Sequence, residues 1–157
     1  MNKPELHSIQ VKILDKRIGS TWKMPQYQTS GAAAMDLIAC HRDTIILKPK
    51  ECQLIPTGIA IFINHDHFCA KILPRSGLGH QHGIVLGNGT GLIDSDYQGP
   101  LMVSCLNRGH DDYPIVPGDR IAQLIFIPIV KPTLCVVEDF DDSSSERGSG
   151  GFGSTGK

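Results

Sequence analysis

Two features are missing from this sequence: an excess of charge of one sign and any long apolar run. Its 157 residues carry 15 lysines and arginines against 16 aspartates and glutamates, so it has no electrostatic footprint for nucleic acid. The longest apolar runs, 59–63 and 124–130, are far shorter than the roughly 20 residues that span a membrane, and residues 1–16 lack the apolar block of a signal peptide. We therefore expect a cytoplasmic protein that binds neither nucleic acid nor a membrane.

Patterns typical of disulfides and metal centres are also scarce. The five cysteines are odd in number and form no C-x-x-C pair, which indicates neither a disulfide framework nor a zinc knuckle. His65 with His67, and His80 with His82, could each chelate a metal ion from one strand face, but no third ligand lies at a recognisable spacing. We interpret the cysteines as reduced core thiols and these histidines as surface or loop residues.

Short apolar or alternating runs, separated by glycine, proline, asparagine and aspartate, fill the chain from Ile9 to Val137. This pattern predicts a single all-β domain, and the spacing suits a jelly-roll-like β-sandwich. A single helical turn is expected at 76–82, where glycines limit its length. The runs that we interpret as strands are 9–14, 44–48, 57–63, 101–106, 120–130 and 133–137.

The composition changes at Glu138, so we divide the chain into a β domain, 1–137, and a flexible glycine-rich tail of the same domain, 138–157. The tail cannot bury enough apolar surface to order itself, and a frayed terminus is one interpretation. The other is phosphate binding, because closely spaced glycines let backbone N–H groups converge on an anion. Residues 151–157 fit the start of a P-loop, but no Ser or Thr follows the lysine to bind magnesium, so we reject the P-loop fold.

Two internal segments carry candidate catalytic groups on turns. In 74–79, Arg75 and Ser76 are either ordinary turn residues or phosphate donors. In 89–100, alternation places Asp94 and Asp96 on one side of an extended hairpin segment. Carboxylates there are commonly turn formers, although near phosphates they can orient water.

Two further segments place polar residues in apolar surroundings. In 117–123 a turn leads into a buried strand, from which Arg120 and Gln123 project polar groups. In 31–39, Asp36 interrupts a stretch of small apolar residues. An unpaired buried carboxylate is costly, so Asp36 needs a polar partner, and water bound to a metal ion would be one.

These four segments and the tail, in this order, closely resemble the five sequence motifs of the homotrimeric deoxyuridine triphosphatases (dUTPases). The resemblance covers the chain from about Val11 to its end and departs at Ala34, where the family usually carries glycine. It implies a jelly-roll protomer in a homotrimer with three sites, each built from three chains. The first, second and fourth motifs would come from one subunit, the third from a neighbour and the tail from the remaining one.

The activity implied by the resemblance is hydrolysis of dUTP to dUMP and pyrophosphate by attack of water on the α-phosphate. Asp94 would orient and deprotonate the water, and Asp36 would contact Mg²⁺ indirectly, through water. Main-chain groups of the hairpin from Asn88 to Asp94 would read uracil, with Gly89 and Gly91 excluding a thymine methyl group. The substrate-binding residues implied are Arg75, Ser76, Gly77, Asn88, Gly91, Ile93, Tyr97, Met102, Gln123, Arg147, Phe152, Gly153, Ser154 and Thr155, with Tyr97 against the deoxyribose and Phe152 over the uracil.

Two alternatives remain. A deoxycytidine triphosphate deaminase of the same fold would need a glutamate in the base pocket, and no glutamate lies between Glu51 and Glu138, which argues against it. The other is a non-catalytic β module that senses nucleotides. Asp94, Arg75 and the complete tail argue against this second alternative.

Overall fold

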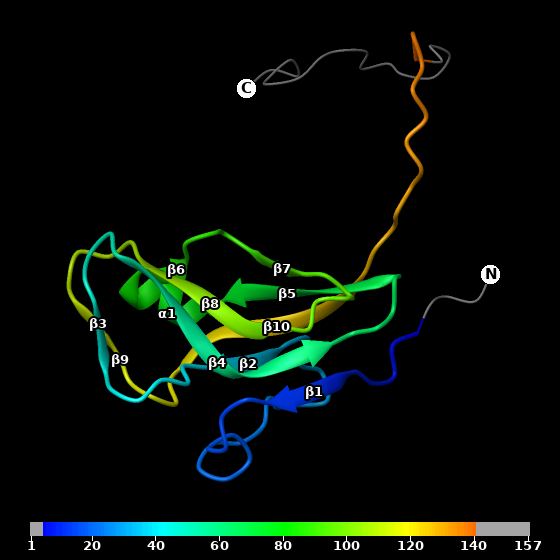
Figure 1. Cartoon of the computed structure of the whole chain (residues 1–157). Helices are drawn as coiled ribbons and strands as arrows, with labels where there is room; N and C mark the ends of the chain where they lie inside the picture. Colours follow the sequence, from blue (N-terminus) through cyan, green and yellow to red (C-terminus); the bar gives the residue numbers. More distant parts are fainter. Residues whose placement is uncertain (1–4, 141–157) are drawn as a thin grey trace.

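The structure, a computed structural model, describes residues 5–140. Figure 1 shows a two-layered β body with one short helix at its edge. One four-stranded sheet has the order β1-β4-β8-β6, the second has the order β2-β10-β5-β7, and β3 pairs with β9 at one end. The elements are β1 (Gln10–Ile13), β2 (Met35–Ile38), β3 (Ile45–Leu47), β4 (Cys52–Phe62), β5 (Phe68–Pro74), α1 (Ser76–His82), β6 (Ile84–Leu86), β7 (Gly91–Ile93), β8 (Pro100–Asn107), β9 (Tyr113–Ile115) and β10 (Arg120–Pro128).

A single apolar core lies between the two four-stranded sheets. Alternate residues of β8 are buried, as expected for a strand with one face on a core. Leu101 and Val103 of β8 meet Leu37 of β2 and Leu124 of β10 in the same cluster of buried residues. The predicted all-β sandwich is therefore confirmed, and so is the helical turn at 76–82.

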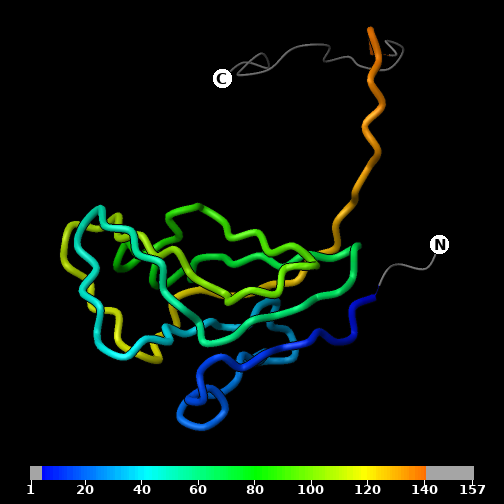
Figure 2. The backbone as a smooth tube through the Cα atoms, in the orientation of Figure 1, coloured from blue at the N-terminus to red at the C-terminus, as the bar shows by residue number. Residues whose placement is uncertain are grey.

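The predicted strand at 133–137 is wrong for this protomer. β10 ends at Pro128, and residues 129–140 form no regular element. Figure 2 shows this segment leaving the body as an extended chain. Its apolar side chains are open to solvent, with Leu134 89% and Val136 97% exposed. The sequence does carry a short apolar run here, but the described residues offer these side chains no neighbouring strand.

The prediction that the cysteines are core thiols holds for three of the five. Cys40, Cys69 and Cys105 are buried, whereas Cys52 and Cys135 are exposed, and all five are free. Burial raises the pKa of the Cys40 thiol to about 11 and that of Cys105 to about 12, because a thiolate is poorly solvated in the core. Within residues 5–140, no helix has the length and apolar character needed to cross a membrane.

Candidate active site

Asp36 is the centre of a polar cluster on β2. Arg75 Nε donates a hydrogen bond to its Oδ1 at 2.8 Å, and Arg120 Nη1 donates to its Oδ2 at 3.2 Å. Arg75 Nη1 also donates to the carbonyl oxygen of Arg120 at 3.3 Å. The polar partner that the sequence required for this carboxylate is thus a pair of guanidinium groups. One negative and two positive side chains leave the cluster with an excess positive charge, which favours an anion.

The pairing of strands explains why these residues meet. On β10, Gln123 lies opposite Asp36 and Arg120 lies opposite Ile38. Because Asp36 and Ile38 share one face of β2, Arg120 is on the same face as Asp36. The register shifts between Arg120 and Ala122, and an irregularity of this kind bends a strand and re-aims its side chains.

Arg75 is fixed at the junction between β5 and α1. It precedes the helix in an extended conformation, with φ −86° and ψ 130°, and its carbonyl oxygen accepts a hydrogen bond from the amide of Gly79 at 2.9 Å. Gln123 Nε2 donates to the carbonyl oxygen of Pro74 at 2.9 Å. Ser76 and Gly77 are exposed beside this junction, so the structure brings five of the expected phosphate-binding and metal-contacting positions together.

Asp94 lies in a turn rather than in an extended segment. β7 ends at Ile93, and the amide of Tyr97 donates to the carbonyl oxygen of Asp94 at 3.3 Å. The predicted alternation that placed Asp94 and Asp96 on one side of a strand is therefore wrong, because the chain leaves the extended conformation after Ile93. The amide of Asn64 donates to the carbonyl oxygen of Ser95 at 2.9 Å and attaches this turn to the body.

The predicted hairpin around residues 88–94 is also wrong as a pair of bonded strands. β6 joins β8 in one sheet, whereas β7 joins β5 in the other, so residues 87–90 form a corner between sheets. Gly89 adopts a left-handed φ of +71° at this corner, and a Cβ on Gly91 would lie 3.1 Å from Cβ of Ile72. Gly91 therefore has a packing reason for lacking a side chain.

The remaining sugar- and base-binding candidates surround this corner or lie on β8. Asn88 is exposed at the corner, and Ile93, at the end of β7, is half-buried. Met102 is half-buried on β8, opposite Pro56 of β4. Tyr97 is 43% exposed, and its hydroxyl group donates to the carbonyl oxygen of Pro100 at 3.1 Å.

Asp94 and Arg75 lie beside opposite ends of β5, although neither belongs to that strand. Ile93 is opposite Ala70, which places Asp94 level with Cys69, six residues before Arg75. At about 3.3 Å per residue of strand, the two are separated by roughly 20 Å within one protomer. One protomer alone therefore does not bring Asp94 to the Arg75 cluster.

Ala34, the one departure from the motif pattern, causes no backbone strain. Among the described residues other than glycine, only Lys50 and Asn64 have a positive φ. Ala34 therefore has an ordinary backbone conformation in the loop before β2.

Comparison with known proteins identifies the family. Residues 20–156 match the family model described as dUTPase. The chain belongs to the dUTPase family. It is 60% identical over 151 residues to the deoxyuridine 5'-triphosphate nucleotidohydrolase of Coxiella burnetii (strain RSA 331 / Henzerling II), covering 96% of this chain and 98% of the relative. It is 58% identical over 152 residues to the protein of the same name in Psychromonas ingrahamii, covering 97% of this chain and 99% of the relative.

Solved dUTPase structures share the fold. The dUTPase of Staphylococcus bacteriophage 80alpha with dUpNHpp superposes with a TM-score of 0.83 at 30% identity, covering 96% of this chain and 99% of that chain. A variant dUTPase from phage phi11 of S. aureus, described as coordinating a structural Mg(II) ion, superposes with a TM-score of 0.74 at 26% identity over 85% of this chain and 99% of that chain.

The candidate site holds one contact that the sequence does not predict. The sequence predicts Arg120 only as a polar group on its strand, whereas in the structure Arg120 shares the carboxylate of Asp36 with Arg75, a contact that only strand register reveals. The tail residues fall outside the described range, so their expected roles stay predictions; they are Arg147, Phe152, Gly153, Ser154 and Thr155.

Proposed function

We propose that this dUTPase-family protein hydrolyses dUTP to dUMP and pyrophosphate, which limits uracil incorporation into DNA and supplies dUMP for dTMP synthesis. The observation that carries the proposal is the cluster of Asp36, Arg75 and Arg120, whose excess positive charge suits a polyphosphate. It occurs in a chain that is 60% identical to a named deoxyuridine triphosphate nucleotidohydrolase.

In the proposed reaction, Asp94 orients a water molecule and accepts its proton as the oxygen attacks the α-phosphorus. The new bond joins that oxygen to phosphorus, the bond to the bridging oxygen breaks, and pyrophosphate leaves. Asp94 is exposed in its turn, so its carboxylate is accessible to substrate and water. Phosphoryl transfer asks little covalent chemistry of a protein, and positioning and charge stabilisation dominate.

The phosphates would be held by groups at the end of β5 and the start of β10. Arg75 presents a planar guanidinium group whose Nε and Nη1 are held by Asp36 and the carbonyl oxygen of Arg120, which leaves Nη2 for a phosphate oxygen. Arg120, with its side chain 56% exposed, supplies a second fork. Ser76, Gly77, Gln123 and the tail residues Arg147, Gly153, Ser154 and Thr155 complete the proposed phosphate contacts.

We propose that Mg²⁺ arrives with the substrate and is not held by a dedicated group of protein ligands. Among residues 5–140 there is no group of three histidine, cysteine, aspartate or glutamate side chains that could hold a metal ion. Mg²⁺ commonly keeps several water molecules and binds through substrate phosphates, and when bound it would neutralise phosphate charge. Asp36 would contact it through one of those water molecules.

Base and sugar would be recognised on the other side of the site. Main-chain groups from Asn88 to Asp94 would complement uracil, and a cytosine amino group would leave buried groups unpaired, which discriminates strongly. Met102 and Tyr97 would contact the nucleoside, with the ring of Tyr97 occupying the space of a ribose 2′-hydroxyl group. Phe152 of the tail would stack on the uracil.

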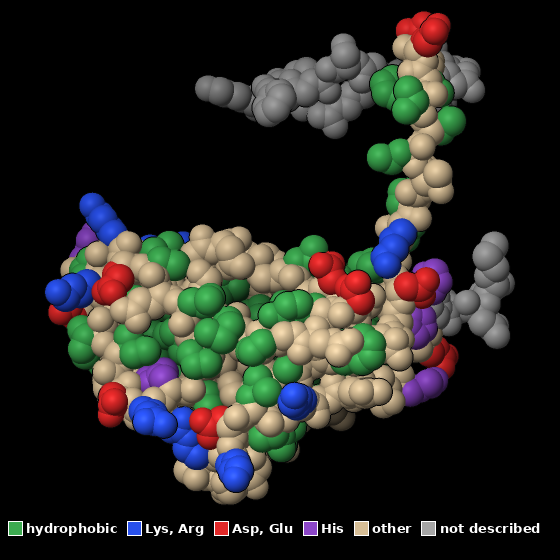
Figure 3. Space-filling view, viewed as in Figure 1, with side chains coloured by type: hydrophobic (Ala, Val, Ile, Leu, Met, Phe, Trp, Pro, Cys, Tyr) green, Lys and Arg blue, Asp and Glu red, His purple; other side chains and the backbone are tan. Residues whose placement is uncertain are grey.

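We further propose a homotrimer whose sites combine three subunits. The separation of Asp94 from Arg75 within one protomer supports this, because a neighbour could bring the two groups together. Apolar surface supports it as well: Leu54 on β4 is 63% exposed, and apolar side chains gather over β4 and β8 in Figure 3. In this proposal the domain of residues 1–137 carries its tail, 138–157, to a neighbouring subunit's site.

The proposed function is tested by incubating the purified protein with Mg²⁺ and, separately, dUTP, dCTP, dTTP and UTP. Pyrophosphate from dUTP, in excess over that from the other three, is the expected result. Ammonia from dCTP would identify a deaminase instead. Nucleotide binding without either product would identify a sensing module.

A further inference from the structure

The turn that precedes Arg120 is packed against Trp22, a residue to which the proposed function gives no role. Gly118 has a left-handed φ of +94°, and a Cβ atom there would lie 2.5 Å from Nε1 of Trp22. The indole ring therefore lies directly against the backbone of this glycine. Any larger residue at 118 would have to displace the ring.

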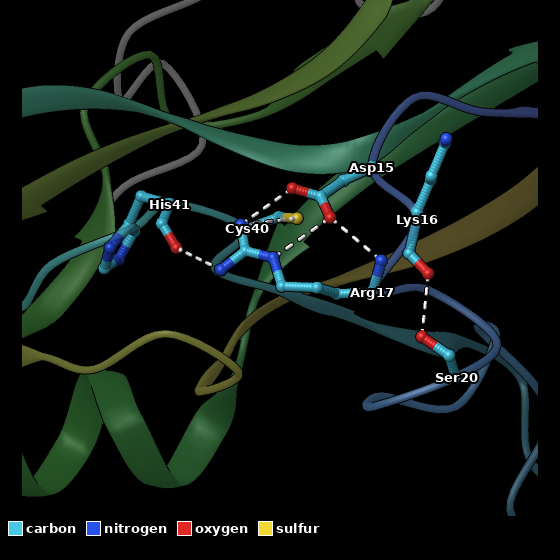
Figure 4. Close-up of polar contacts among 6 residues, drawn as sticks. All are labelled: Asp15, Lys16, Arg17, Ser20, Cys40 and His41. Atoms are coloured by element: carbon cyan, nitrogen blue, oxygen red, sulfur yellow. Dashed lines mark hydrogen bonds and ion pairs between the residues drawn. The ribbon is translucent and has the colours of Figure 1, made fainter.

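Trp22 is itself held by a charged pair. The Arg17 guanidinium carbon lies 4.6 Å from the centroid of the Trp22 ring, within the range of a cation–π contact. Arg17 Nε and Nη2 donate to the two carboxylate oxygens of Asp15 at 3.0 and 2.7 Å, and Arg17 Nη1 donates to the carbonyl oxygen of His41 at 3.0 Å. Figure 4 shows Arg17 pointing between Asp15 and the backbone of His41. Every guanidinium nitrogen of Arg17 is thus engaged.

The opposite side of the turn is bonded to the chain that follows β2. The amide of Gly118 donates to the carbonyl oxygen of Ala39, and the amide of Ala39 donates to that of Asp119, both at 2.8 Å. The turn is therefore held between this backbone and the Trp22 ring. Arg120 follows immediately and reaches Asp36 through a bond of 3.2 Å, so the position of the turn sets the point of the backbone from which this side chain extends.

We propose that Asp15, Arg17 and Trp22 form a positioning unit that sets Arg120 against Asp36 and thereby determines phosphate affinity. The inference rests on the proposed function, in which Arg120 binds substrate phosphates. Loosening the unit would let Arg120 leave its place beside Asp36, weakening an interaction made in both the ground state and the transition state. Losses of this kind raise KM and leave kcat nearly unchanged. Asp94 lies on the turn after β7 and makes no contact with this unit, so the chemical step keeps its base.

Trp22 also provides a direct measurement. It lines a hollow of about 350 Å³ together with Asp36 and Arg120, and it is the single tryptophan of the chain. Its emission therefore reports on the hollow beside the proposed phosphate site. We expect the non-hydrolysable analogue dUpNHpp to change this emission in the native protein.

The test compares two variants. Arg17→Met removes the guanidinium group and retains an unbranched side chain, and Lys16→Met is a matched loss of positive charge on the neighbouring exposed residue. Arg17→Met is expected to raise KM for dUTP roughly tenfold with kcat within about twofold, whereas Lys16→Met should match the native enzyme. Trp22→Phe should retain most of the affinity that Trp22→Ala loses. Thermal unfolding of each variant provides the folding control, and if Trp22→Ala does not fold, the Arg17→Met and Lys16→Met pair decides.

Unchanged KM in Arg17→Met, or a fall in kcat alone, would overturn the positioning role. Calorimetric titration with dUpNHpp keeps this test separate from the proposed function. If the native protein binds dUpNHpp but does not hydrolyse dUTP, the proposed activity fails, and a roughly tenfold weaker Kd in Arg17→Met still supports positioning. Equal Kd values in the native and Arg17→Met proteins would contradict it.

Discussion

Arg75 Nε donates a hydrogen bond to Oδ1 of Asp36 at 2.8 Å, joining the end of β5 to β2 across 39 residues of sequence. This contact, with the bond from Nη1 to the carbonyl oxygen of Arg120, orients the guanidinium plane of Arg75 and leaves Nη2 available for a ligand. Asp94, in contrast, lies at the other end of β5. The proposed general base and the proposed phosphate-binding arginine are therefore far apart within one protomer.

Replacing Asp94 by asparagine tests the proposed general base. The amide cannot accept the proton of the attacking water, so turnover should fall by at least the roughly 10²-fold typical of a lost general base. Binding of dUpNHpp should persist. Asp96→Asn, in the same exposed turn, is the matched control and should keep its activity. Near-native turnover in Asp94→Asn, measured by pyrophosphate release, would remove Asp94 from this role.

Mixing two inactive variants tests whether the site is shared between subunits. Asp94→Asn and Arg75→Ala should each be inactive as pure proteins. In an equal mixture, reassembled after mild denaturation, three-quarters of the trimers would be mixed and each would keep one intact site of three, so about a quarter of native activity should return in a cyclic trimer. A site contained in one protomer would give no recovery, and a mixture of Asp94→Asn with Asp94→Ala is the negative control.

Deleting the residues after Glu146 tests the tail. A lid that supplies phosphate donors and a stacking ring is expected to be essential for turnover and dispensable for assembly. The rate of hydrolysis should therefore fall sharply, while light scattering should report an unchanged number of subunits. Substituting Phe152 by leucine within the full chain separates base stacking from phosphate binding. If the truncated protein kept native kinetics, the tail would be a frayed terminus.

The pair of Asp15 and Arg17 predicts a pH dependence of stability. Hydrogen bonds from the side chain and the amide of Arg17 lower the pKa of Asp15 from its ordinary value of 3.8. A lowered pKa in the folded protein stabilises it above the ordinary pKa, and this contribution is lost as the pH falls towards the lowered value. Asp15→Asn should therefore reduce Tm at pH 7, and the difference from the native protein should shrink below about pH 4.

Asp43→Asn, at an exposed aspartate, provides the control for Asp15→Asn in thermal unfolding followed by circular dichroism. Its Tm should track that of the native protein across the pH range. A Tm difference for Asp15→Asn that stays constant down to the lowest pH would show that the Asp15 carboxylate charge does not stabilise the fold.

Local patterns predicted much of this fold because their causes are local. Glycines around 76–82 predict a helix as short as the one observed, and short apolar runs between turn residues locate β4, β8 and β10. Which sheet a strand joins is not a local property, so the corner at 87–90 was misinterpreted as a hairpin. The partners of Asp36 were missed for the same reason, since Arg75 and Arg120 lie 39 and 84 residues away.

The error at 133–137 has a different physical origin. The segment has the short apolar run of a strand, but a strand needs a neighbour for its backbone groups and its apolar side chains. The described part of this protomer provides none. A pattern in one sequence shows that a surface needs covering and does not show which molecule covers it.

The extended segment beyond β10 should therefore make the stability of the protein depend on its concentration. In a single protomer this segment exposes an apolar surface. It is formed by Leu134, Val136 and Phe140, all at least 89% exposed. Exposing these side chains to water costs free energy until another surface packs against them and excludes the water. Tm would then rise with protein concentration. Strong dilution would favour the dissociated form, which is the form most prone to aggregation and proteolysis.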